Sequence, residues 1–227
     1  MIPLRDSTRS RSFPVITVAL IAINLYVYYL QDTSTQAELG RFISQYALVP
    51  ARFTEQLRLN PLAVFFHHPL VTSTFLHGSW FHVIFNMLYL WIFADNIEDR
   101  LGRPRFILFY LLAGIAGNLA HILLNPGSPI PLVGASGAIA GVLGAYIITF
   151  PRARITSLLF IFFFITIRDI PAIYFLLFWF LLQVINGVAS LGIMGNNVAY
   201  WAHIGGFLSG VVLMLILKKK NSWQPRF

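Results

Sequence analysis

The stretch from Leu132 to Tyr146, LVGASGAIAGVLGAY, is an apolar, glycine-rich segment that carries one serine, Ser136, near its start. Gly137 and Gly141 have the small-xxx-small spacing through which membrane helices pack closely. A polar side chain in hydrocarbon must find a partner or serve a purpose. The stretch therefore predicts a membrane helix in close contact with another helix, and it makes Ser136 the residue to explain.

The composition indicates a membrane protein. The chain has 227 residues, of which 57% are hydrophobic and only 11% are charged, too few to cover a soluble globule. It contains no cysteine, which excludes disulfides, thiolate metal sites and a cysteine nucleophile. The formal net charge is +8, but the basic residues stand in short clusters beside apolar runs, as topology signals do. We therefore expect a lipid bilayer as partner and no binding of nucleic acid.

Apolar runs predict an all-α membrane protein with six transmembrane helices, against the roughly 20 residues that a full crossing needs. The six runs are Pro14–Leu30, Trp80–Ala94, Phe106–Leu124, Ser136–Phe150, Ile170–Val188 and Tyr200–Leu217. A further run, Ile155–Ile167, is too short to span and is expected to be interfacial or buried. The long first outer loop, Gln31–Ser79, mixes apolar and polar residues, so we expect it to lie on or partly in the membrane surface.

Basic residues set the orientation of these six spans. Of the 16 Lys and Arg residues, only Arg41, Arg52 and Arg58 fall on the outer side. The positive-inside rule then places both termini in the cytoplasm. The expected organisation is an N-terminal tail (1–13), a six-helix domain (14–217) and a basic C-terminal tail (218–227). We expect an integral, multi-pass protein of the bacterial inner membrane.

Four polar side chains converge at one depth under this topology. Ser136 opens the fourth span, His203 lies near the start of the sixth, and His82 and Asn86 lie in the first turns of the second, on one helix face. Each alone is more often a packing or interfacial residue. Their coincidence in the outer leaflet favours a nucleophile, Ser136, with a base, His203.

The residues that a metalloprotease or a Ser-His-Asp triad would need are missing from the spans. The sequence has no HExxH motif, and if both were helical His77 and His82 would point about 140° apart, so we expect no metal site. No acidic residue falls within a span at the depth of Ser136, which leaves a Ser-His dyad unless the outer loop lends Asp32, Glu38 or Glu55. The remaining polar residues of the spans are expected to be structural: Asn24, Asn118, His121 and Gln183.

Three ordered motifs carry a family resemblance. The segments HGSWFHVIFN (His77–Asn86), GASG (Gly134–Gly137) and AHIGG (Ala202–Gly206) together resemble the rhomboid family of intramembrane serine proteases. The resemblance implies a six-helix rhomboid bundle, a serine endopeptidase that hydrolyses peptide bonds of transmembrane protein substrates and uses no cofactor. It also implies Ser136 as nucleophile, His203 as general base, and an oxyanion hole made by His82, Asn86 and the Ser136 N–H.

The sequence departs from well-known members at two places. The Trp-Arg pair of the first outer loop is absent, and the position of the tyrosine that stacks on the catalytic histidine is Ala140. We expect Gly134, Phe85 and Trp179 to contact substrate, and Phe175 and Trp179 to form a lipid-facing flank of the fifth span. Two rival functions remain open: a rhomboid-like protein that binds membrane clients without cleaving them, and a transporter or channel.

Overall fold

Helices form most of the molecule, and each of the six apolar runs forms a helix. Their ends lie within three residues of the expected ones, except that the helix beginning at Trp80 continues to Leu101, seven residues beyond the expected end at Ala94. The computed structural model describes residues 1–62, 67–161, 164–191 and 198–218. Its helices are α1 (Val15–Thr33), α2 (Gln36–Tyr46), α3 (Pro50–Leu59), α4 (Pro69–Thr72), α5 (Trp80–Leu101), α6 (Arg103–Leu124), α7 (Ser136–Thr149), α8 (Ala172–Ala189) and α9 (Tyr200–Leu217), with a 3₁₀ turn, η2 (Ser73–Phe75).

Four of these helices, α1, α6, α8 and α9, are long and apolar enough to cross a membrane. Helix α7 is apolar but has only 14 residues. Helix α5 has 22 residues and carries charged side chains in its last two turns, among them Asp95, Glu98 and Arg100. The chain is therefore an integral, multi-pass membrane protein, and the count of six spans stays a prediction.

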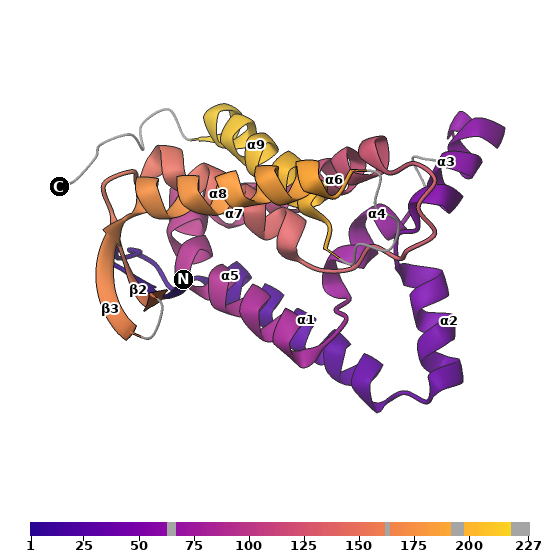
Figure 1. Cartoon of the computed structure of the whole chain (residues 1–227), viewed down its shortest axis with the longest axis horizontal. Coiled ribbons are helices and arrows are strands. Elements are labelled where there is room, and N and C mark those ends of the chain that lie inside the picture. The colour runs from indigo at the N-terminus through magenta and orange to yellow at the C-terminus, as the bar shows by residue number, and fades with distance from the viewer. Residues whose placement is uncertain (63–66, 162–163, 192–197, 219–227) are drawn as a thin grey trace.

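Helix α7 is the centre of the bundle. Most of its side chains are buried, because α5, α6, α8 and α9 all contact it (Figure 1). A Cβ atom on Gly206 would collide with the carbonyl oxygen of Gly137, and one on Gly210 would collide with that of Gly141. The expected small-xxx-small contact between α7 and α9 is thus confirmed.

The molecule is mostly helical, as expected, but it is not all-α, because three strands form an antiparallel sheet in the order β1-β2-β3. These are β1 (Ile2–Asp6), β2 (Arg154–Ile161) and β3 (Phe164–Pro171). In the described part of the run Ile155–Ile167, residues 155–161 belong to β2 and residues 164–167 to β3, so the run is not a spanning helix. β-branched and aromatic residues favour strands, and the two strands pair with each other. The expected N-terminal tail contains β1.

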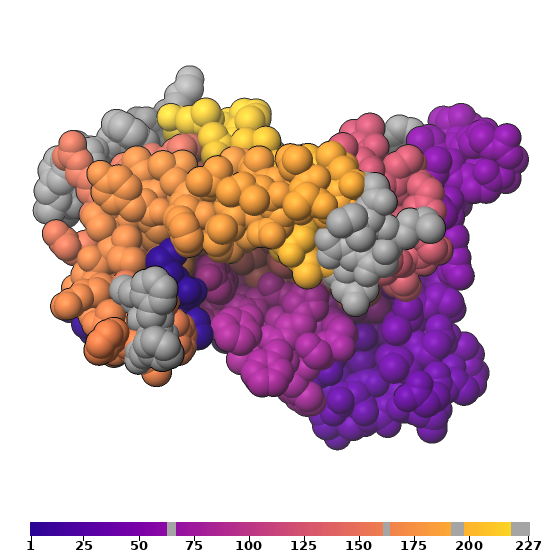
Figure 2. Space-filling model, viewed as in Figure 1, coloured from indigo at the N-terminus to yellow at the C-terminus, as the bar shows by residue number. Residues whose placement is uncertain are grey.

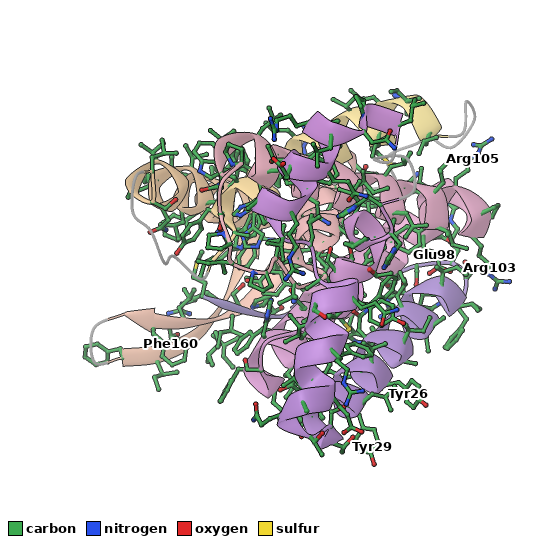
Figure 3. All side chains as sticks on the ribbon, turned by 90° about the vertical axis from the view of Figure 1, so that its right-hand side faces the viewer. Tyr26, Tyr29, Glu98, Arg103, Arg105 and Phe160 are labelled. Atoms are coloured by element: carbon green, nitrogen blue, oxygen red, sulfur yellow. The ribbon has the colours of Figure 1, made fainter. Side chains whose placement is uncertain are left out.

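Buried polar contacts tie the N-terminal segment to the bundle. The Asp6 carboxylate accepts hydrogen bonds from the Tyr146 hydroxyl and from Asn96 Nδ2, the latter at 3.0 Å, and burial raises the pKa of Asp6. The Glu98 carboxylate accepts from the Ile16 N–H at 3.0 Å and from the Thr17 N–H at 2.8 Å. Glu98 (labelled in Figure 3) thus caps the N-terminus of α1, where backbone donors lack helical partners.

The first outer segment is folded rather than extended. It contains α2, α3, α4 and η2 and lies at the end of the molecule far from the sheet (Figure 1). A short bridge joins Leu48 to Leu132, so this segment supports the chain that leads into α7. Its contact with a membrane surface stays a prediction. Most of the expected basic C-terminal tail, including Lys219, Lys220 and Arg226, lies outside the described residues.

Candidate active site

Ser136 and His203 are brought together at the starts of two packed helices. Ser136 is the first residue of α7, and His203 lies in the first turn of α9. The Ser136 Oγ and His203 Nε2 atoms are 2.8 Å apart, within hydrogen-bonding distance. The close approach of Gly206 to Gly137 fixes the two helices at this separation. The pair that the sequence analysis selects is therefore in direct contact.

Gln183, on α8, holds the other side of the His203 ring. Its Oε1 atom lies 2.8 Å from His203 Nδ1, while its Nε2 donates to the Trp179 carbonyl oxygen at 3.4 Å. The second contact sets the orientation of the amide, so Oε1 accepts and Nδ1 carries the proton. His203 Nε2 is then unprotonated and accepts from Ser136 Oγ.

Gln183 is expected from the sequence to be structural, and its contact with His203 is not predicted. Gln183 and Trp179 stand four residues apart on α8, a spacing that places them on one helix face. That spacing was the available signal, but only the packing of α8 on α9 shows that this face meets His203. The amide thus occupies the position that a carboxylate has in a Ser-His-Asp triad.

The three acidic residues of the outer segment have other partners. Asp32 accepts from Trp80 Nε1 at 3.1 Å, Glu38 forms a capping box with Thr35, and Glu55 pairs with the adjacent Arg58 at 2.9 Å. The alternative in which one of them completes a triad is therefore not supported, since the Nδ1 partner of His203 is Gln183.

A cavity of about 840 Å³ lies against the Ser-His pair. Its walls come from α5, from α7 and the chain that leads into it, from α8 and from the start of α9. Figure 2 shows a hollow between α8 and α5 on this face of the molecule. Both His203 and Ser136 line the cavity, as do Asn86, His82 and Phe85 from α5. These five predicted site residues thus share one hollow, on three helices.

Asn86 is buried and has an unused donor. It is 8% exposed, and among the described residues its Nδ2 atom has no hydrogen-bond partner. A buried amide donor without a partner costs free energy, so it calls for an explanation. Asn86 lines the cavity beside Ser136, although its Nδ2 atom is itself buried.

The His82 ring packs directly against the backbone of Gly134. The Gly78 N–H lies 3.5 Å from His82 Nδ1, a long contact that leaves His82 Nε2 as the ring donor. A Cβ atom on Gly134 would lie 2.8 Å from His82 Nε2, and Gly134 has a φ of 128°. Both the space and the backbone conformation therefore require glycine at this position.

His77 supports the chain around the site. It precedes α5, so the helical angle assumed for His77 and His82 is wrong, and their rings are in edge contact with centroids 5.0 Å apart. The Ala135 N–H lies 3.5 Å from His77 Nε2, and Gln31 bonds to the His77 backbone. Burial lowers the pKa of His77 to about 3, so the ring is neutral. Within the described residues, no group of three or more His, Cys, Asp or Glu side chains forms a metal cluster.

The aromatic residues expected to contact substrate or to face lipid, Phe85, Trp179 and Phe175, do not all lie at the cavity. Phe85 and Trp179 both line the cavity, and the Trp179 ring centroid lies 6.0 Å from that of His203. Ala140 on α7 supplies no ring to stack on His203, and the aromatic neighbour of His203 comes from α8 instead. Phe175 is buried and packs on Phe93, so its expected exposure to lipid is wrong.

A family model and several known proteins that resemble this chain all carry the rhomboid name. The family model described as the Rhomboid domain matches residues 66–220. "Rhomboid protein 1, mitochondrial" of Saccharomyces cerevisiae is 30% identical over 199 residues, which cover 86% of this chain and 51% of that protein. "RHOMBOID-like protein 1" of Arabidopsis thaliana is 30% identical over 213 residues, covering 88% of this chain and 50% of that protein.

A third relative matches a shorter region. "Presenilin-associated rhomboid-like protein, mitochondrial" of Homo sapiens is 38% identical over 98 residues, which are 42% of this chain and 26% of that protein. The chain thus spans about half or less of the length of these curated relatives. Two of the three names refer to mitochondria, so these relatives do not support the expected bacterial inner membrane.

Proposed function

We propose that this chain, which belongs to the rhomboid family, is an intramembrane serine endopeptidase that hydrolyses peptide bonds in or next to transmembrane segments of other membrane proteins. The observation that carries the proposal is the 2.8 Å contact between Ser136 Oγ and His203 Nε2 beside a cavity. A serine hydroxyl is a weak nucleophile at neutral pH, and a base at this distance activates it.

In the proposed first step, Ser136 Oγ forms a bond to the carbonyl carbon of the substrate and passes its proton to His203 Nε2. The Nδ1–H group of His203 remains bonded to Gln183 Oε1, which keeps the ring oriented while it carries the extra proton. The protonated ring then donates to the leaving amine as the C–N bond breaks. Water hydrolyses the resulting ester of Ser136 by the same route in reverse.

The oxyanion of the intermediate needs hydrogen-bond donors. We assign this role to Asn86 Nδ2, to His82 and to the Ser136 N–H at the start of α7. Gly134, Phe85 and Trp179 form the surface against which the substrate chain lies, since Phe85 and Trp179 line the cavity and Gly134 lacks a side chain that would crowd His82. In the proposed topology all six helices span, and both termini lie in the cytoplasm.

Active-site labelling tests the proposal directly. The purified protein in detergent should react with a serine-directed fluorophosphonate, and the Ser136→Ala variant should not. Labelling of both proteins to the same extent would place the reactive serine elsewhere. If neither protein is labelled and no membrane substrate is cleaved, the chain is instead a rhomboid-like protein that binds clients without cleaving them.

A further inference from the structure

The hairpin of β2 and β3 exposes large apolar side chains at its far end. Phe160, Phe164, Ile165 and Ile167 are between 56% and 75% exposed. They belong to a sequence in which every residue from Leu158 to Ile165 is apolar. A patch of this kind on a monomer usually marks a surface that something else covers.

These side chains point to both faces of the hairpin. Phe160 pairs with Ile165, so these two lie on one face, while Phe164, the residue before Ile165 in β3, lies on the other. A protein partner that docks on a sheet covers one face. A surrounding apolar medium covers both, and lipid is such a medium.

The base of the hairpin is held where α7 ends and α8 begins. β3 continues into α8 without a linker, and the Ala172 N–H donates to the Ala153 carbonyl oxygen at 2.7 Å. In Figure 1 the strands run across the end of the bundle, transverse to α8. In Figure 3 the hairpin projects sideways beyond the helices, with Phe160 near its end. The apolar end therefore extends beside the bundle at the depth where α8 begins.

The apolar surface is continuous with the membrane-facing side of α8. The first turns of α8 expose Tyr174, Leu177 and Phe178, and α8 is one of the helices long and apolar enough to span. Lipid that surrounds these side chains would also meet a hairpin that starts from the same point.

Arginines lie in the half of the sheet nearer the bundle rather than at the apolar end of the hairpin. Arg5, Arg154 and Arg168 are exposed there, and Arg5 Nε donates to Thr156 Oγ1 at 3.4 Å. Cations beside an apolar surface are typical of segments that lie in the membrane interface, where they contact anionic headgroups.

We propose that the β2–β3 hairpin inserts its apolar end into the boundary between headgroups and acyl chains, in the leaflet opposite the Ser136–His203 pair. Anionic lipid headgroups are the partners of Arg5, Arg154 and Arg168. The hairpin thereby anchors the start of α8, the helix that carries Gln183 and Trp179. This inference does not depend on proteolytic activity.

Depth-dependent fluorescence quenching tests the insertion. Because the chain has no cysteine, single variants Phe164→Cys and Ile165→Cys can be labelled with an environment-sensitive probe and reconstituted in vesicles of phosphatidylcholine and phosphatidylglycerol. Phe178→Cys on α8 serves as a lipid-exposed control, and Arg11→Cys, exposed at the same end of the bundle, as a water-exposed control. Circular dichroism and size-exclusion chromatography select the variants that fold.

Insertion predicts that nitroxide-labelled lipids quench the probes at both hairpin positions, as at position 178, and that aqueous iodide does not. Quenching by iodide as strong as at position 11 would overturn the proposal. Protection from both quenchers, with energy transfer between differently labelled copies, would assign the patch to a second copy and also overturn it. The double variant Arg154→Gln, Arg168→Gln should weaken lipid quenching at position 165 in anionic vesicles only, and an unchanged signal would refute the role of the arginines.

Discussion

The amide of Gln183 holds His203 on the side of the ring opposite Ser136, with Oε1 2.8 Å from Nδ1. A carboxylate in this position would stabilise the protonated imidazole by its charge, whereas an amide supplies orientation alone. A neutral partner avoids the cost of placing a charge among packed membrane helices. Gln183 is therefore a positioning residue, and its replacements should separate orientation from charge.

Replacing Gln183 tests this role. We expect Gln183→Leu to lower kcat by about tenfold, the scale of one neutral hydrogen bond, with little change in KM. Gln183→Glu keeps the acceptor and should retain activity, but the acid limb of its pH–rate profile should move to higher pH because the carboxylate favours the protonated ring. Asn186→Leu, on the exposed side of α8, is the matched control. An unchanged kcat and pH profile in both Gln183 variants would leave it only a packing role.

Removing either member of the dyad should abolish cleavage. Ser136→Ala lacks the nucleophile and His203→Ala lacks the base, and because the two act as one unit, the double variant should be no worse than either single variant. Turnover of a model transmembrane substrate in proteoliposomes provides the measurement. Substantial cleavage by folded Ser136→Ala would end the serine-protease proposal.

Loss of Asn86 should slow the chemical step. If Asn86 Nδ2 donates to the oxyanion, Asn86→Ala should lower turnover by about 10²-fold or more, the scale for one such donor. Thermal stability should change little or even rise, because the donor that is lost is buried without a partner. Wild-type turnover by the folded variant would exclude Asn86 from the oxyanion hole.

Adding one methyl group between α7 and α9 should disturb their contact. In Gly206→Ala the new Cβ collides with the Gly137 carbonyl oxygen, so the helices must separate and the Ser136–His203 distance must grow. We expect reduced activity and a lower Tm, although no catalytic atom is changed. Gly40→Ala is the control, since no atom lies within 4 Å of its added Cβ. Equal behaviour of the two variants would show that the helix contact tolerates expansion.

The cap supplied by Glu98 should stabilise the fold. Glu98→Gln places an amide N–H₂ group against the backbone donors of Ile16 and Thr17, and we expect a loss of about 1 to 3 kcal/mol in the free energy of unfolding. Glu55→Gln, which breaks an exposed pair with Arg58, should cost far less. Denaturation of both variants in the same detergent gives the comparison, and similar losses would mean that the cap contributes little.

The sequence alone was enough to predict that Ser136 and His203, each at the start of a helix, belong to one site. Ser136 and His203 could be paired in advance because glycine spacing on two helices predicts close contact, and contact brings helix starts at one depth together. Gln183 could not be assigned, because the face of a uniformly apolar helix that meets its neighbour is not marked by periodicity. Phe175 was misassigned for the same reason: an aromatic side chain suits both lipid and core.

The sheet was missed for a different reason. A short apolar run does not show by periodicity whether it is strand, buried helix or interfacial segment. Its partner strand β1 is distant in sequence and too short to be recognised alone. The pairing of Arg5 with Thr156 exists only in the folded chain.

That pairing also constrains the order of biosynthesis. Arg5 and Thr156 are 151 residues apart, so the ribosome makes β1 long before its partner exists. During this interval α1 through α7 are synthesised while the β1 backbone groups remain without strand partners. Pairing across so long a separation is slow, because the entropy of closing the loop must be overcome first. Closure of the sheet must therefore wait until α1 through α7 have been made, and it joins the N-terminal segment to the part of the chain that leads into α8.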